Sequence, residues 1–469
     1  MSQFKRSLNF RSTIAIVIGG IIGSGIFMKP ALMASQLGSP FLLLSVWLVA
    51  GIVTLLGALS NAEIAAMFPE TGGQYVFFQK MYGNGFAFMY GWAAFAVFNC
   101  GGNASIAYVC AQYLHYFIAL PQLPDTIVQS CRLHIPLIGN FMPLDNIGLK
   151  LVTMLLVMVL TLINYRSVQY GAGLQRWLTS LKIIAMLLLV GGIGFSGKGN
   201  MHFFTQNSST MPVGLSLISA YMAAIAGAFW AYDGWNNISF VAGEVQNPQK
   251  NIPKSLIIGL LLCISIYALI NTVYIYVLPI QQMASSSFVA SDAATKVWGI
   301  GGGAMIALLV ILSTVGTANA NILATARVTY TMGKENSLFA WAGKEQNKYN
   351  TPGNALLLNA CWSVVLILSG SFDMLTDMLI FVSWFFYGMS ALGVFILRKK
   401  YAQKERPYKV WGYPLVPVIF IVFTLFFLVV TVYTDIKGYR AGHTQIINSF
   451  WGIAITLTGL PLYFLFRKK

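Results

Sequence analysis

The sequence predicts an all-α integral membrane protein with twelve transmembrane helices. Of its 469 residues, 57% are hydrophobic and only 9% are charged, whereas a soluble domain carries roughly 25% charged residues. Apolar blocks recur from one end of the chain to the other, each of about 20 residues, the length of helix that crosses a bilayer. No stretch is polar enough to form a separate soluble domain, so we expect one transmembrane domain over 1–469.

Proline, glycine and charged residues separate the apolar blocks and place the twelve helices. They are expected near 12–36, 40–67, 83–118, 148–165, 171–195, 213–243, 254–279, 299–332, 354–370, 375–397, 414–434 and 447–466. The first ten divide into two sets, 12–195 and 213–397, and two additional helices follow in 414–466. Several blocks exceed a minimal span, so tilted or kinked helices are expected.

The basic residues orient the chain. The formal net charge is +16, but the Lys and Arg residues lie between the apolar blocks instead of on one basic face, which argues against nucleic acid. Of the 29 basic residues, 21 lie on the side that carries both termini, seven lie on the opposite side, and Lys182 lies inside a span. This bias predicts that both termini are cytoplasmic in a multi-pass protein of the plasma or inner membrane.

The first helix has a cluster of glycines at mid-span, Gly19, Gly20, Gly23 and Gly25, with Ser24 among them. Glycine disfavours a continuous helix because it loses the most backbone entropy on ordering. One interpretation is close helix packing through a small-xxx-small pair. The other is an unwound segment with free N–H and C=O groups at the two half-helix ends, which together suit a zwitterion.

A second interruption falls five spans later, in the segment from Phe229 to Asn236, where Asp233 and Gly234 break an apolar helix. Equivalent breaks in two inverted halves are typical of secondary transporters. Five-helix inverted repeats therefore fit the spacing. The alternative is an aromatic core stripe that tolerates one acid.

Lys182 lies near the middle of the fifth predicted span. An ionisable group at that depth costs on the order of 3 kcal/mol, so a function is the default hypothesis. Its ammonium either joins helices 5, 1 and 8 through carbonyls and hydroxyls, as a bound sodium ion would, or titrates as a proton-coupling group. A purely structural role stays open. Glu63, Glu244 and Arg327 lie nearer the cytoplasmic ends, where ion pairs are expected.

The chain is not expected to be an enzyme or to carry a cofactor or metal. Its four histidines are scattered, without metal-ligand spacing or a paired nucleophile. The five cysteines form no Cys-x-x-Cys pair, and most lie within spans. Cys131 falls in the longest outer loop, so a disulfide to a partner subunit stays open there.

Several short motifs together resemble the amino acid–polyamine–organocation superfamily, and more closely its L-amino acid transporter branch. The resemblance covers nearly the whole chain. The motifs are Gly-Ser-Gly-Ile-Phe at 23–27, Pro-Glu-Thr-Gly-Gly-Gln-Tyr at 69–75, Ala-Tyr-Asp-Gly-Trp-Asn at 231–236, Glu244 with Asn247-Pro248, Ala-Thr-Ala-Arg at 324–327 and Glu-Arg-Pro at 405–407.

The resemblance implies an inverted five-plus-five helix fold with two added helices, alternating access, and amino-acid transport by exchange or with protons. It places the substrate carboxylate at the N–H groups of Ser24 and Gly25, with Gly23 and Ile26 alongside. It places the α-amino group at the carbonyls of Ile21, Trp230 and Asp233. The other expected site residues on helix 6 are Ala231, Tyr232 and Asn236.

The resemblance also assigns two special residues. Trp230 matches the aromatic lid that closes over bound substrate, and Lys182 matches the helix-5 lysine that replaces a sodium site. Asp233 departs from the family pattern, since many relatives have a small or apolar residue there. Helical heavy-chain partners occur with animal members of this branch, but nothing in the sequence requires one.

The resulting hypothesis is a sodium-independent L-amino acid exchanger for small neutral substrates. A proton-coupled symporter of broader or cationic specificity is the alternative, because a carboxylate at Asp233 suits a cationic side chain. An amino-acid-sensing membrane receptor that uses the same site without turnover is the alternative of another class.

Overall fold

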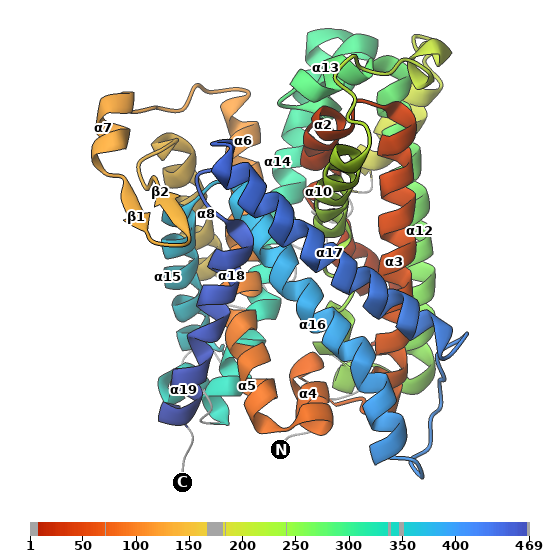
Figure 1. Cartoon of the computed structure of the whole chain (residues 1–469), viewed down its shortest axis with the longest axis vertical. Coiled ribbons are helices and arrows are strands. Elements are labelled where there is room, and N and C mark those ends of the chain that lie inside the picture. The colour runs from red at the N-terminus through yellow and green to blue at the C-terminus, as the bar shows by residue number, and fades with distance from the viewer. Residues whose placement is uncertain are drawn as a thin grey trace.

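The structure is a computed structural model, and it is an α-helical bundle (Figure 1). It describes residues 8–70, 72–166, 182, 184–240, 242–335, 339–346 and 351–466. Within these residues, eight helices are long and apolar enough to cross a membrane, and one bent helix pair makes a ninth candidate. The all-α transmembrane fold class is thereby confirmed, whereas the count of twelve spans stays a prediction.

The long apolar elements follow the predicted spans closely. The eight are α3 (Pro40–Met67), α5 (Asn84–Ala93) continuing through η1 (Ala94–Asn99) into α6 (Cys100–His115), α8 (Ile147–Arg166), α10 (Leu215–Tyr232) with α11 (Asn237–Phe240), α12 (Pro248–Val277), α14 (Val289–Lys334), α16 (Phe372–Lys400) and α17 (Leu415–Arg440). The bent pair is α1 (Phe10–Ile21) and α2 (Gly25–Leu37), at an angle of 40°.

Three further predicted spans fall on shorter or partly described helices. These are α15 (Gly353–Ser369), α18 (Asn448–Leu457) with α19 (Gly459–Phe466), and the apolar helix Ile184–Ile193. Apart from Lys182, the earlier part of the predicted span 171–195 lies outside the described residues.

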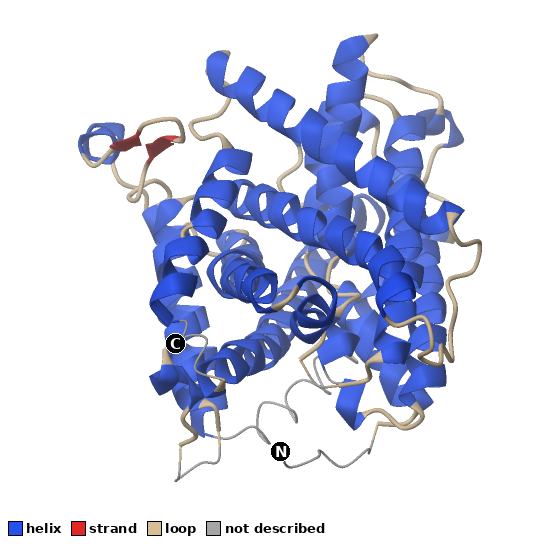
Figure 2. Cartoon of the chain, turned by 60° about the horizontal axis from the view of Figure 1, so that its bottom comes forward, coloured by secondary structure: helices blue, strands red, loops and turns tan. Residues whose placement is uncertain are grey.

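Short elements mark the two ends of the bundle. At one end lie α7 (Asp125–Ser130), the hairpin of β1 (Leu133–Ile135) and β2 (Gly139–Phe141), and α13 (Ile280–Ser285), whereas α4 (Gln74–Tyr82) and α19 lie at the other (Figure 1). The two strands are antiparallel and stand at the rim of the helices (Figure 2). We call these the hairpin end and the α4 end.

Both predicted helix breaks are present. α1 ends at Ile21 and α2 begins at Gly25, which leaves three residues between the two half-helices outside helical structure. α10 ends at Tyr232, and a four-residue turn leads to α11. Within this turn Gly234 has φ +96°, a conformation that side-chain-bearing residues rarely adopt. Glycine is therefore required at the second break.

The ion pairs expected near the α4 end are confirmed. Glu63 is fully buried in α3 and accepts hydrogen bonds from Arg398 Nη2 and from Val410 N, each at 2.7 Å. Arg327 Nη1 lies 3.2 Å from Glu244 Oε1. These pairs join α3 to the end of α16, and α14 to the segment after α11.

Candidate functional site

The two helix breaks touch each other through their backbones. A Cβ added at Gly234 would lie 2.4 Å from the carbonyl oxygen of Gly20, and one added at Gly25 would lie 2.6 Å from Ala231 Cα. Real Cβ atoms essentially never approach other atoms under 3.0 Å. Glycine at these positions therefore lets the ends of four half-helices meet at one point.

A tyrosine from α12 bridges the two breaks. The hydroxyl of Tyr267 donates to the carbonyl oxygens of Ile21 at 2.9 Å and of Ala231 at 3.0 Å. Each carbonyl belongs to the last turn of a half-helix, where it lacks an intrahelical donor. Tyr267 therefore holds the carbonyl ends of α1 and α10 beside each other.

We expect Tyr267→Phe to lower the thermal stability of the purified protein and to reduce transport several-fold, because a lost buried hydrogen bond costs about 1 kcal/mol or more. Tyr274→Phe is the matched control on the same helix, since the Tyr274 hydroxyl is buried and has no hydrogen-bond partner among the described residues. Melting curves and initial uptake rates of both variants check this. Equal behaviour of the two variants would contradict the bridging role.

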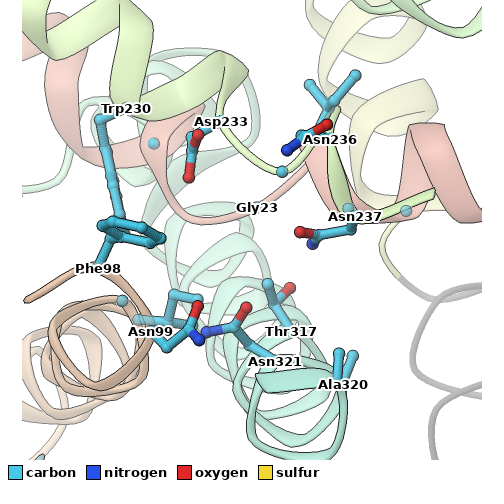
Figure 3. A pocket seen from close by; sticks show the side chains of 18 of the residues that line it. Gly23, Phe98, Asn99, Trp230, Asp233, Asn236, Asn237, Thr317, Ala320 and Asn321 are labelled. Atoms are coloured by element: carbon cyan, nitrogen blue, oxygen red, sulfur yellow. The ribbon is translucent and has the colours of Figure 1, made fainter. Parts of the chain in front are cut away.

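A cavity of about 640 Å³ lies at the contact between the breaks. Both breaks line it, together with residues of η1, α6, α14 and α16, as Figure 3 shows in part. The lining residues from these other elements include Phe98, Asn99, Ile106, Thr317, Ala320, Asn321, Leu379 and Tyr387. A small organic molecule fits a cavity of this size.

Three buried polar atoms of the cavity lining have no hydrogen-bond partner within the described part of the chain: Ser24 Oγ, Trp230 Nε1 and Asn99 Nδ2. Buried polar groups in folded proteins are nearly always paired with protein or with water. Ser24 also precedes the first turn of α2, whose leading N–H groups lack intrahelical acceptors. These groups can therefore pair with a ligand or with water in the cavity.

Lys182 lies next to the first break. Its side chain is buried, and Nζ donates to the carbonyl oxygen of Ile22 and, at 2.9 Å, to Thr317 Oγ1 of α14. It does not line the cavity. These two hydrogen bonds tie the non-helical segment of helix 1 to α14.

Asp233 gives the cavity one carboxylate. Its Oδ1 accepts a hydrogen bond of 2.8 Å from the hydroxyl of Tyr387, on α16. No Lys or Arg is among the described residues that line the cavity. Asn236 lies on the same turn, but its Oδ1 accepts from Asn61 Nδ2 at 2.6 Å, which anchors the turn to α3.

The structure gathers most of the predicted site residues at the cavity. Those that line it are Ile21, Gly23, Ser24, Gly25, Trp230, Ala231, Asp233 and Asn236. Ile26 and Tyr232 do not. Ile26 is fully buried, and the Tyr232 hydroxyl donates instead to the carbonyl of Trp47 at 3.0 Å.

Other helices supply walls of the cavity that were not predicted from the sequence, among them Phe98, Asn99, Asn321 and Tyr387. The first two lie in the π-helical turn η1, and π-helical turns occur frequently at functional sites. The available signal was the pair of amides Asn99 and Asn103 near the middle of a mostly apolar span. Nothing in the sequence indicated which of the polar residues of α14 and α16 face the same cavity.

On the two broken helices, the cavity lining runs from the breaks towards the α4 end and stops at Gly25 and Trp230 towards the hairpin end. Its lining continues along α1 to Ala15 and along α11 to Phe240, both on the α4 side of the breaks. On the other side, Trp230 packs edge-on against Phe372 with ring centroids 6.2 Å apart. Lys29 Nζ lies 4.7 Å from the centre of the Phe372 ring and 2.7 Å from Asp373 Oδ1.

A cavity with a few polar groups at the contact of two broken helices is typical of a secondary transporter of a small solute. Residues 8–460 match the family model described as amino acid permease. The chain belongs to the amino acid permease family. It is a multi-pass membrane transporter of amino acids and not an enzyme.

Several characterised transporters are similar over nearly the whole chain. The serine/threonine exchanger SteT of Bacillus subtilis (strain 168) is 29% identical, over 99% of this chain and 98% of its own length. The b(0,+)-type amino acid transporter 1 of Mus musculus is 27% identical, over 99% of this chain and 88% of its own length. The cystine/glutamate transporter of Homo sapiens is 28% identical, over 99% of this chain and 86% of its own length.

Proposed function

We propose that the protein is a sodium-independent exchanger of small neutral L-amino acids that works by alternating access. The observation that carries this proposal is the contact of the two helix breaks at one cavity. It brings the N–H end of α2 and the carbonyl ends of α1 and α10 together. An amino acid presents the complementary pair, a carboxylate and an ammonium.

The substrate carboxylate would bind the N–H groups of Ser24 and Gly25, with the Ser24 hydroxyl as a further donor. The ammonium would bind the carbonyl oxygens of Ile21, Trp230 and Asp233. Ile21 O already accepts from Tyr267, but a carbonyl oxygen has two lone pairs and can accept a second bond. Trp230 lies between this site and the hairpin end, where it would act as the lid.

Sodium independence is proposed from Lys182. Its ammonium bonds the Ile22 carbonyl and the Thr317 hydroxyl, oxygen ligands that a sodium ion between the first break and α14 would need. A second positive charge beside the ammonium would be repelled at this distance in a buried site. The lysine would therefore take the structural place of a bound sodium ion.

A second candidate, proton-coupled transport of broader or cationic specificity, is favoured by Asp233. Among the described residues that line the cavity, Asp233 is the single acidic residue, and no basic residue there neutralises its charge. Such a carboxylate can bind a cationic substrate side chain or carry a proton. We place exchange of neutral substrates first because the Tyr387 hydroxyl already bonds Asp233.

We further propose that the α4 end, with both termini, faces the cytoplasm, so that the structure corresponds to an inward-facing state. The excess of basic residues on that side supports this orientation. The inverted repeats are assigned to 12–195 and 213–397. A heavy-chain subunit is optional, and the exposed Cys131 beside the hairpin would be its attachment point.

Uptake into proteoliposomes of the purified protein tests the proposed function. Vesicles are loaded with each amino acid in turn, and uptake of labelled serine is measured with and without sodium or proton gradients. We expect uptake to require a small neutral amino acid inside and to ignore sodium. Uptake that is independent of the internal amino acid but driven by an inward proton gradient would favour the second candidate, and stimulation by sodium would refute the assignment of Lys182.

A further inference from the structure

Asn99 carries a buried hydrogen-bond donor that the described part of the chain leaves unpaired. The residue is 7% exposed, and its Nδ2 has no partner there. An unpaired buried donor destabilises a fold, so such groups persist mainly where a ligand or water pairs with them. Because Asn99 lines the cavity, a bound substrate is the natural source of the missing acceptor.

The local helix geometry places Asn99 at the cavity. Asn99 is the last residue of η1, the π-helical turn that interrupts the helix running from α5 to α6, and Phe98 and Asn99 both line the cavity as a result. Figure 3 shows the Asn99 and Asn321 side chains on the same side of the cavity, across from the segment of Gly23. Asn99 therefore lines the cavity from a different helix than the groups proposed to bind the substrate backbone.

Residues near Asn99 hold the Asn321 side chain in place and leave space beside it. Asn321 Nδ2 donates to Asn103 Oδ1 at 2.8 Å, so that donor of Asn321 is already used. A Cβ at Gly102 would lie 3.3 Å from Asn321 Nδ2, which shows that glycine keeps this part of the wall open. Ile106 and Leu379 supply apolar surface nearby.

We propose that Asn99 determines specificity by donating from Nδ2 to a hydroxyl or amide oxygen on the substrate side chain. This inference rests on the proposed function and narrows its substrate class to small neutral amino acids whose side chain carries a hydrogen-bond acceptor. An acidic side chain is disfavoured because Asp233 lies in the same cavity and no basic residue lines it within the described chain. A purely apolar side chain leaves the donor unpaired.

Threonine and valine test the proposal, since they share a shape and differ in one hydroxyl. We expect the counterflow kcat/KM of the wild type to favour threonine by about tenfold, because a site that hydrogen-bonds a substrate group rejects the analogue that lacks it. Asn99→Leu should bring the ratio close to one. Asn99→Ser, which keeps a donor, should retain part of the preference.

Asn359→Leu is the control for a structural effect. Asn359, in α15, also has a buried Nδ2 without a partner among the described residues, but it accepts from Thr329 at 2.8 Å and does not line the cavity. Its loss should slow both substrates alike and leave their ratio unchanged. Thermal stabilisation of each variant by threonine and by valine gives a second readout that does not require transport.

The two proposals fail in different ways. Equal use of threonine and valine by the wild type, or an unchanged ratio in both Asn99→Leu and Asn99→Ser, would overturn the role of Asn99 and leave amino-acid exchange intact. Absence of exchange and of thermal stabilisation with every amino acid would refute the proposed function, and the role of Asn99 with it.

Discussion

Lys182→Ala is expected to abolish most exchange, with rates below roughly a tenth of the wild-type value. Its ammonium bonds the carbonyl of Ile22 in the first break and the hydroxyl of Thr317 on α14. Hydrogen bonds to charged groups contribute about 1.5–3 kcal/mol each, which corresponds to roughly 10–100-fold in an equilibrium. Without them, the non-helical segment that we propose to hold the substrate carboxylate loses its fixed position.

Lys150→Ala is the matched control for this experiment. Lys150 is also buried, and its Nζ donates to the carbonyls of Met142 at 2.9 Å and Leu368 at 3.3 Å, near the hairpin and away from the cavity. Both variants should melt at lower temperature than the wild type, but only Lys182→Ala should lose counterflow per folded molecule. A Lys182→Ala protein that exchanges amino acids as fast as Lys150→Ala would disprove the special role of Lys182.

The positions of the helices and of both breaks were predictable because local composition determines them. An apolar run of sufficient length must be helical in a bilayer, since its backbone groups have no other partners there. The first break follows from the density of glycines between Gly19 and Gly25, and the second from Asp233 and Gly234, whose φ of +96° needs glycine. These are properties of neighbouring residues, which a sequence displays directly.

The side-chain walls of the cavity were not predictable in the same way. They depend on the rotation of each helix about its axis and on which helices pack together. Tyr232 illustrates the first point, because its hydroxyl bonds the carbonyl of Trp47 although its neighbours Ala231 and Asp233 line the cavity. Tyr267 illustrates the second, because its bonds to Ile21 and Ala231 join residues that are far apart in the sequence.

The π-helical turn η1 is a third case. It adds one residue to a helical turn and so changes the direction of every side chain near it. Neither the apolar pattern nor the glycines around 101–102 indicated where that change occurs. Asn99 consequently escaped the sequence-based site, although a polar amide at mid-span is costly enough to have marked it as a candidate.

Gly25→Ala should reduce exchange by roughly 100-fold while the protein still folds. The added Cβ would lie 2.6 Å from Ala231 Cα and 2.7 Å from Ala231 Cβ, so the two breaks must separate. Their separation moves the N–H groups of α2 away from the carbonyl ends of α1 and α10, and a displacement of about 1 Å at a reacting or binding centre costs on the order of 100-fold. Gly301→Ala is the control, because no atom of the described residues lies within 4 Å of a Cβ at Gly301, an exposed position of α14.

The measurement is counterflow of serine together with thermal melting for both glycine variants. Gly301→Ala should match the wild type in rate and melt at the same or a slightly higher temperature, since alanine favours helix over glycine. Gly25→Ala should show weaker stabilisation by added serine as well as slow exchange, because both depend on the same backbone groups. If Gly25→Ala binds and exchanges serine normally, the close contact of the two breaks does not form the substrate site, and recognition must lie elsewhere in the cavity.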